Sequence, residues 1–298
     1  MAKKFPSVSI GLPSWRVQVF LPDLPDSYYR GTRFDRAGVF GSVRLFRQEF
    51  CAPWLESCDP LRHDNVQGPA EEWGQAFYDE AAPGETFLKI GVGKLVRPDD
   101  GPYDHFRLYE VADAGTRENT VSGRTLTMRH ILDGVYDYTK VIALGTIGEM
   151  TLSHRLTNTG TRPIESTVYN HNFFTLGSYS VRQGREIAFP YPIHGKWREE
   201  YDSVYHGLGH DISFRRKLKS GESVFMGDIR SVFDEVSPYD LRILHKGTGL
   251  SVHVSSPTPF DWANFWANHR IACIEPFVAL RIAPGETFIQ TIQYNLSI

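Results

Sequence analysis

Alternation of apolar and polar residues constrains the fold of this chain more than any other feature of its sequence. In residues 150–156, one face of an extended segment carries Met150, Leu152, His154 and Leu156. Residues 250–254 repeat the pattern, as do residues 288–296, where Gln290 interrupts the apolar face. Because successive side chains of a β-strand point to opposite faces, a period of two predicts half-buried strands.

A short phrase recurs at three places. PGETF occurs at 83–87 and at 284–288, and SGESVF at 220–225 is a looser copy. Pro and Gly favour a turn, whereas the Thr, Phe or Val that follows favours a strand, so each copy predicts a turn leading into a strand. Helix signals are weak, and residues 68–80 are expected to form no more than a turn or two.

The expected fold class is all-β, a large antiparallel β-sandwich, with residues 1–298 as one domain, because no linker composition interrupts the chain. The net charge is -3 without a basic block, which argues against nucleic acid and anionic membranes as partners. The N-terminus lacks a secretory h-region, and no apolar run reaches about 18 residues. We therefore expect a cytoplasmic protein, monomeric or homodimeric.

The three cysteines and one histidine pair give little sign of a metal site. Cys51, Cys58 and Cys273 are odd in number and fit no zinc spacing. Free thiols are expected, with a Cys51–Cys58 bridge as the alternative. His206 and His210 have an H-x-x-x-H spacing, but Gly207 and Gly209 oppose the helix that would align them. Neither a metal nor a cofactor is predicted.

The segment STVYNHNFF, residues 166–174, places His171 among aromatic and amide side chains. On a strand, one face carries Thr167, Tyr169, His171 and Phe173, and the other carries Val168, Asn170, Asn172 and Phe174. Aromatic rings can stack on the C–H face of a sugar, while an imidazole exchanges protons near neutral pH. The alternative is a structural histidine that is hydrogen-bonded to the backbone.

Glu275 lies in the apolar run RIACIEPFVAL and is therefore expected to be at least partly buried. Burial raises the pKa of a carboxyl group, and a nearby cation or hydrogen bonds lower it. In either case Glu275 is a candidate base. The alternative is a glutamate in an ordinary salt bridge at the end of a strand.

The first half of the chain supplies further candidates for contacts with a substrate. Arg30 and Arg33 present planar forks of donors suited to sugar hydroxyls or a carboxylate, unless they belong to a charged hairpin. Glu71 and Glu72 are adjacent, so they point to opposite faces of a strand. Glu72 is taken as a hydrogen-bond acceptor for substrate and Glu71 as solvent-facing. His105, in the turn DDGPYDH, is a candidate to face a cleft.

Three segments in order resemble the aldose 1-epimerase (galactose mutarotase-like) superfamily. They are LSHRLTNTGTRPIESTVYNHNFFTLG, WANFWANHRIACIEP and ACIEPFVALRIAPGE, and the resemblance covers the second half of the chain. It implies a β-supersandwich, with His171 as catalytic acid and Glu275 as catalytic base. The arginine and histidine motifs of the family's first half are absent. Arg33, with Arg30 as a substitute, and His105 are assigned to those roles in what is expected to be a divergent branch.

The resemblance implies an isomerase that exchanges sugar anomers without a cofactor. Glu275 would take the proton of the anomeric hydroxyl while His171 protonates the ring oxygen, and the ring would open, rotate and close. The two side chains are expected at opposite edges of one sugar-sized hollow. A lyase on the same scaffold is one alternative, with a carboxylate neutralised by Arg30, Arg33, Asn170 or Asn172. A sugar-binding protein without turnover is the other.

Overall fold

A computed structural model of the chain describes residues 5–22, 25–177, 181, 184–233 and 236–298. These residues form three antiparallel sheets and one short 3-10 helix, η1 (Glu199–Tyr201). The all-β prediction is thereby confirmed. No helix among the described residues has the length and apolar character to cross a membrane.

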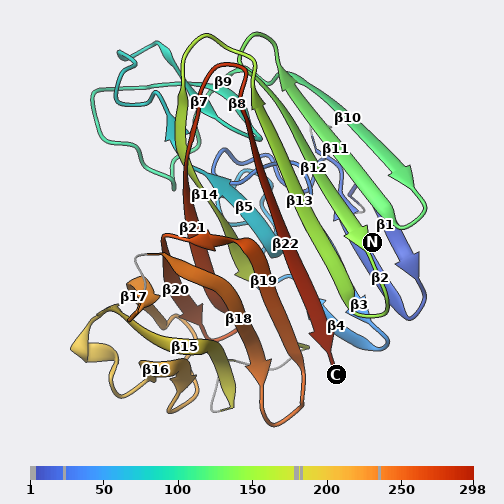
Figure 1. Cartoon of the computed structure of the whole chain (residues 1–298), viewed down its shortest axis with the longest axis vertical. Helices are drawn as coiled ribbons and strands as arrows, with labels where there is room; N and C mark the ends of the chain where they lie inside the picture. Colours follow the sequence, from blue (N-terminus) through green and yellow to red (C-terminus); the bar gives the residue numbers. More distant parts are fainter. Residues whose placement is uncertain (1–4, 23–24, 178–180, 182–183, 234–235) are drawn as a thin grey trace.

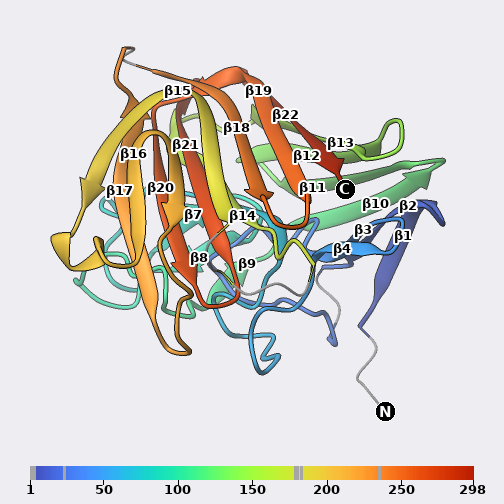
Figure 2. The ribbon, with the colours of Figure 1, turned by 90° about the horizontal axis from the view of Figure 1, so that it is seen from below.

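Two four-stranded sheets flank a larger one. The first contains, in spatial order, β1 (Ser7–Leu12), β2 (Trp15–Phe20), β3 (Phe40–Leu45) and β4 (Gln48–Cys51). The second contains β6 (Gln75–Ala76), β7 (Thr86–Lys89), β8 (Gly93–Val96) and β9 (Val111–Asp113). Figure 2 shows the first sheet beside the β10 end of the large sheet. The indole nitrogen of Trp15 on β2 donates to the Glu149 carbonyl at 3.0 Å and links the two sheets.

The large sheet has fourteen strands. Its order begins with β10 (Thr116–Ser122), β11 (Thr125–Leu132), β12 (Tyr136–Leu144), β13 (Glu149–Asn158), β22 (Thr287–Ser297), β19 (Ser251–Phe260) and β18 (Ser237–His245). It continues with β15 (Arg185–Trp197), β17 (Ser223–Ser231), β20 (Trp262–Asn268), β21 (Ala272–Ile282), β14 (Ile164–Phe173) and β5 (Gly68–Trp73), and β16 (Tyr205–Phe214) pairs with β15.

Strands from the two ends of the large sheet pack against each other and enclose the main core. The rings of Trp73 on β5 and Tyr138 on β12 meet edge to face, with centroids 5.4 Å apart. The Tyr294 hydroxyl on β22 donates to Asn172 on β14 at 3.2 Å. The sheet therefore curves back on itself into a sandwich (Figure 1). As predicted, the alternating residues of 150–156 send Met150 and Leu152 into this core.

The three recurring phrases precede strands, as predicted. Thr86 begins β7, Thr287 begins β22 and Ser223 begins β17. The glycine of each copy has a positive φ, +88° at Gly84, +81° at Gly285 and +80° at Gly221. Only glycine adopts that backbone conformation without strain, which explains why the same phrase serves at three places.

Residues 68–76 correct one expectation. They form β5 and the short β6 instead of helical turns. β5 pairs with β14, so that Glu72 lies opposite Tyr169 and Glu71 opposite Asn170. As predicted, the two glutamates point to opposite faces. The prediction that Glu71 faces solvent is wrong, because its side chain is buried in the core against Lys140 of β12.

A cluster of buried polar side chains surrounds Glu71 between the two layers. Lys140 contacts the Glu71 carboxylate, and Asn170 donates to it at 2.7 Å. His154 Nε2 lies 3.5 Å from Glu71 Oε1, and the Tyr138 hydroxyl bridges His154 Nδ1 and Asp35 at 3.0 and 2.9 Å. Burial, helped by the charge of Lys140 and opposed by Glu71, lowers the pKa of His154 to about 4.

The depressed pKa of His154 predicts a loss of stability in mild acid. Between pH 6.5 and 4 the unfolded chain protonates this imidazole and the folded chain does not, so stability falls as pH falls. The shift corresponds to about 3 kcal/mol at 1.36 kcal/mol per pKa unit. Asp35 acts in the opposite sense, because burial raises its pKa to about 6.

Comparison of the wild type with His154→Gln separates the effect of His154 on the pH dependence of stability from that of Asp35. Chemical unfolding is measured at pH 7, 6, 5 and 4. From pH 7 to pH 4, the free energy of unfolding of the wild type should fall by about 3 kcal/mol relative to that of the variant. A constant difference between the two curves would mean that folding does not lower the pKa of His154.

The three cysteines are free thiols, with Cys51 and Cys273 buried and Cys58 exposed. The predicted free thiols are therefore present, and the alternative Cys51–Cys58 bridge does not form.

Candidate active site

Neighbouring strands bring the two principal candidates together on one face of the large sheet. β14 carries His171, and the adjacent β21 carries Glu275 (Figure 1). His171 Nε2 lies 2.9 Å from Glu275 Oε1. The two side chains are 6% and 8% exposed, so the pair is desolvated but still reaches a surface.

This geometry corrects one expectation. The side chains were expected at opposite edges of a sugar-sized hollow, and they touch instead. Direct contact suits the predicted chemistry, because the anomeric oxygen and the ring oxygen of a sugar are bonded to the same carbon. An acid and a base that serve those two oxygens must therefore lie side by side.

Both side chains open into a cavity of about 630 Å³, within the range of small-molecule sites, roughly 300–1,000 Å³. Most of its wall is aromatic or polar. The lining residues are Arg33, Trp54, His63, Asp64, Glu72, Gly74, Gln75, Tyr103, His105, Phe106, Thr167, Tyr169, His171, Phe173, Phe225, Asn264, Trp266, Glu275 and Phe277.

Alternation along β14 builds one wall of this cavity. Thr167, Tyr169, His171 and Phe173 line it, while Val168 and Phe174 belong to the main core. This is the division of faces that the sequence predicts. Phe277 lies beside Tyr169 on β21, and Asn264 of β20 lies beside Glu275.

Aromatic rings hold the His171 imidazole in place. It stacks on Phe173 with centroids 3.6 Å apart and an interplanar angle of 8°, and Trp54 also stacks on Phe173, with centroids 5.2 Å apart. Phe34 and Trp266 meet the imidazole edge-on at 6.0 and 6.2 Å. His171 Nδ1 is buried, and no described group accepts or donates a hydrogen bond there. Contact with Glu275 therefore fixes the direction of Nε2.

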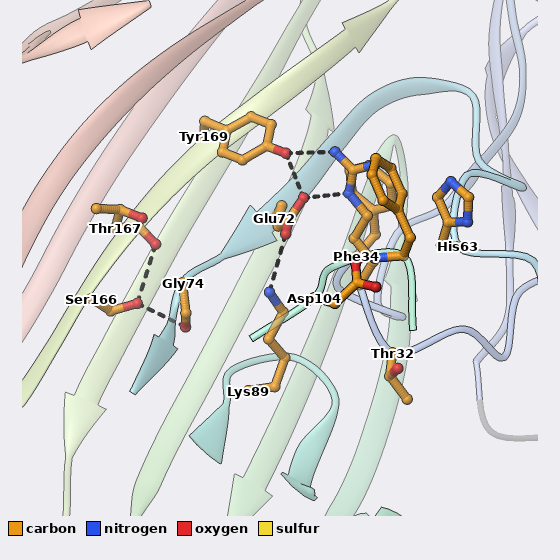
Figure 3. Close-up of polar contacts among 12 residues, drawn as sticks. Thr32, Phe34, His63, Glu72, Gly74, Lys89, Asp104, Ser166, Thr167 and Tyr169 are labelled. Atoms are coloured by element: carbon orange, nitrogen blue, oxygen red, sulfur yellow. Dashed lines mark hydrogen bonds and ion pairs between the residues drawn. The ribbon is translucent and has the colours of Figure 1, made fainter. Parts of the chain in front are cut away.

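A second polar cluster lies on the same cavity wall and is centred on Glu72. Arg33 Nε contacts Glu72 Oε2 at 2.6 Å, and Arg33 Nη2 donates to the Tyr169 hydroxyl at 3.1 Å. The Tyr169 hydroxyl also donates to Glu72, and Lys89 Nζ lies 3.3 Å from Glu72 Oε1 (Figure 3). All these groups come from separate segments of the chain.

Two cations keep Glu72 ionised. Burial alone would raise the pKa of Glu72, but Arg33 and Lys89, together with hydrogen bonds from Arg33 and Tyr169, lower it to about 2. Burial raises the pKa of Tyr169, so its hydroxyl stays protonated and donates to Glu72. Burial lowers the pKa of Lys89, although Glu72 opposes that effect.

Two further histidines line the cavity near Arg33. His63 and His105 both meet the ring of Phe106 edge-on, with centroids 4.8 and 4.0 Å apart. Burial lowers the pKa of each, and the charge of Arg33 acts in the same direction, so both are neutral near pH 7. In the described ranges, no three His, Cys, Asp or Glu side chains gather where they could hold a metal ion.

Five of the eight predicted site residues line the cavity: His171, Glu275, Arg33, Glu72 and His105. The other three do not. Arg30 is exposed outside it, and Asn170 and Asn172 point from β14 into the core. The Asn172 amide nitrogen donates to the Ile274 carbonyl at 2.9 Å, so this side chain forms a structural hydrogen bond within the protein. Because these asparagines lie on the face opposite His171, they cannot contact a ligand in this cavity.

The sequence indicated no role for eleven lining residues: Trp54, His63, Asp64, Gly74, Gln75, Tyr103, Phe106, Phe225, Asn264, Trp266 and Phe277. Asn264 and Trp266 occur in the alternating segment WANFWAN and face the cavity from β20. Their alternation was readable, but the pairing of β20 with β21 was not. Trp54, His63 and Asp64 lie in a loop, for which the sequence has no periodic signal.

Comparison with known proteins identifies the fold. No protein-family model matches the chain, and no curated protein matches its sequence. Among solved structures, a Synechocystis protein is 12% identical, covers 99% of this chain and 96% of its own, and gives a TM-score of 0.59. An Escherichia coli protein named as a candidate aldose 1-epimerase is 13% identical with 98% of each chain covered and a TM-score of 0.55.

A galactose mutarotase-like protein from Lactobacillus casei is 10% identical, with 98% of this chain and 100% of that chain covered and a TM-score of 0.52. The fold is therefore the galactose mutarotase-like sandwich, as the sequence predicted. At such identities the similarity concerns the fold, and the chemistry has to be argued from the cavity itself.

Proposed function

We propose that the cavity catalyses exchange between the anomers of an aldose, with Glu275 as the base and His171 as the acid. The observation that carries the proposal is the 2.9 Å contact between the two side chains in the wall of an aromatic cavity. Aromatic rings suit the C–H faces of sugars, and the names of the similar structures point to carbohydrate chemistry.

The proton transfers balance if the pair begins as imidazolium and carboxylate. A bound sugar would replace the contact between the two side chains, with its anomeric hydroxyl on Glu275 and its ring oxygen on His171 Nε2. Glu275 takes the hydroxyl proton as His171 gives its proton to the ring oxygen, and the C1–O5 bond breaks. After rotation about C1–C2, the neutral imidazole and the carboxylic acid reverse both transfers as the ring closes.

Placement of the asparagines weakens the lyase alternative. A lyase must neutralise a carboxylate next to the proton it abstracts, and Asn170 and Asn172 lie in the core. Arg33 is already paired with Glu72. The remaining alternative, sugar binding without turnover, differs from the proposal only in whether His171 and Glu275 move protons.

The direct test is the rate at which freshly dissolved α-D-glucose and α-D-galactose approach anomeric equilibrium, followed by polarimetry or NMR. Acceleration proportional to protein concentration is the expected result. The sugar-binding alternative predicts saturable quenching of the Trp54 and Trp266 fluorescence by sugar without any acceleration, and that outcome would reject the proposal.

A further inference from the structure

Most charged side chains in the cavity wall already have an oppositely charged partner. Arg33 is the only Arg or Lys among the described lining residues, and Glu72 compensates it at 2.6 Å. Asp64 is compensated by Arg62, whose Nε lies 2.8 Å from Asp64 Oδ1. Lys89 is fully buried behind Glu72 and does not line the cavity. Glu275 contacts His171, and no Arg or Lys in the described part of the chain forms an ion pair with it.

Glu72 also determines which donors of Arg33 face the cavity. It holds Nε, and the Tyr169 hydroxyl accepts from Nη2, so one edge of the guanidinium is occupied. Within the described residues, nothing accepts from Nη1. The Arg33 side chain packs over Phe34 at 4.7 Å, which keeps the guanidinium plane fixed. The remaining N–H groups form an oriented donor for an uncharged oxygen.

An anionic group would meet a poor environment in this cavity. A phosphate carries about -1.5 to -2 charges at pH 7 and needs cations that are not already neutralised. The cation that lines the cavity, Arg33, is already paired with Glu72, and the His171–Glu275 contact offers no Arg or Lys to a phosphate. Hydroxyl groups need only oriented donors and acceptors, which Arg33, Asn264 and the two neutral histidines supply.

We infer that Glu72 is a specificity-determining residue that makes the cavity select uncharged sugars over phosphorylated ones. It does so without touching the substrate, by aligning Arg33 and by offsetting the positive charge of Arg33. This inference rests on the proposed function for its kinetic test, but it makes a separate prediction for binding. It also replaces the expectation that Glu72 accepts a hydrogen bond from substrate, because Arg33, Lys89 and Tyr169 already occupy its oxygens.

The test compares α-D-glucose with α-D-glucose 6-phosphate. The wild type is expected to show at least tenfold higher kcat/KM for glucose, and tenfold tighter binding by fluorescence titration. Glu72→Gln keeps the shape of the side chain and leaves Arg33 and Lys89 uncompensated. It should move the ratio at least tenfold towards the phosphate, and this gain should weaken as salt screens it.

Glu71→Gln is the matched control. Glu71 is the neighbouring glutamate of β5, is equally paired with a buried lysine, and faces the core instead of the cavity. Both variants lose a buried ion pair, but only Glu72→Gln alters the charge of the site. A purely structural role for Glu72 predicts that both variants lose activity on the two sugars in equal proportion. An unchanged ratio in Glu72→Gln would therefore overturn the inference.

Two further measurements test the inference if Glu72→Gln does not fold or if the protein does not turn over either sugar. Lys89→Met removes a cation while Glu72 remains, and it should move the ratio at least threefold further towards glucose. Binding titrations decide the inference even if neither sugar is turned over. Tighter binding of glucose without acceleration of anomer exchange would reject the proposed function and support charge selection. Acceleration together with a preference for the phosphate would support the proposed function and reject charge selection.

Discussion

Glu275→Gln should lower kcat for anomer exchange by a factor of about 10² to 10⁴ and leave the fold intact. Glutamine has the shape of glutamate and can still accept a hydrogen bond from His171 Nε2, but it cannot take a proton. The loss should appear in kcat, because in the proposed complex the aromatic wall and Arg33 would still hold the sugar. Polarimetry measures kcat, and circular dichroism verifies that the variant is folded.

Glu165→Gln is a suitable control for that variant. Glu165 lies on β14 and pairs with Arg281 of β21 at 2.8 Å, across the same two strands as His171 and Glu275. Both members of this pair are exposed, so substitution of Glu165 should change kcat less than twofold. If the wild type is active and Glu275→Gln keeps full activity, a group other than Glu275 must take the proton.

The losses of kcat caused by substituting His171 and Glu275 should not multiply in a double variant. Because the proposed mechanism transfers both protons in one step, removing the second side chain should add little once the first is gone. A His171→Gln, Glu275→Gln double variant is therefore expected to be no slower than the slower single variant. Multiplicative losses would show that the two groups act in separate steps.

The sequence predicted much of this cavity because strands have a simple period. Once residues 166–174 are taken as a strand, Tyr169, His171 and Phe173 must share a face, and the structure places them on one cavity wall. The same alternation places Asn170 and Asn172 on the opposite face. Their assignment to substrate binding contradicted a rule already applied to their neighbours.

Pairings between distant strands could not be read from the chain. Nothing in the sequence near Glu72 indicates that its partners are Arg33, Lys89 and Tyr169, which lie up to 97 residues away. Likewise, two adjacent glutamates gave no sign that both are buried. Burial of a charged pair on each face of β5 depends on lysines contributed by β7 and β12, and those contacts exist only after the sheets assemble.

The largest expected loss of stability comes from the core side of β5. Glu71→Gln should lower the free energy of unfolding by about 3–5 kcal/mol, because it leaves a buried ammonium without a counter-ion. Lys140 is fully buried, contacts Glu71, and otherwise donates to the Ala37 carbonyl at 3.1 Å. Chemical unfolding followed by tryptophan fluorescence measures the change.

Removal of both charges should be less harmful than removal of one. In the Glu71→Gln, Lys140→Met double variant no unpaired charge remains, so part of the lost stability should return relative to either single variant. Glu80→Gln provides the exposed counterpart. Its pair with Arg162 lies at the surface, and such pairs contribute no more than about 1 kcal/mol. If Glu71→Gln costs no more than Glu80→Gln, then Lys140 must lose its proton or find water when Glu71 is gone. The ion pair would then align β5 without stabilising it.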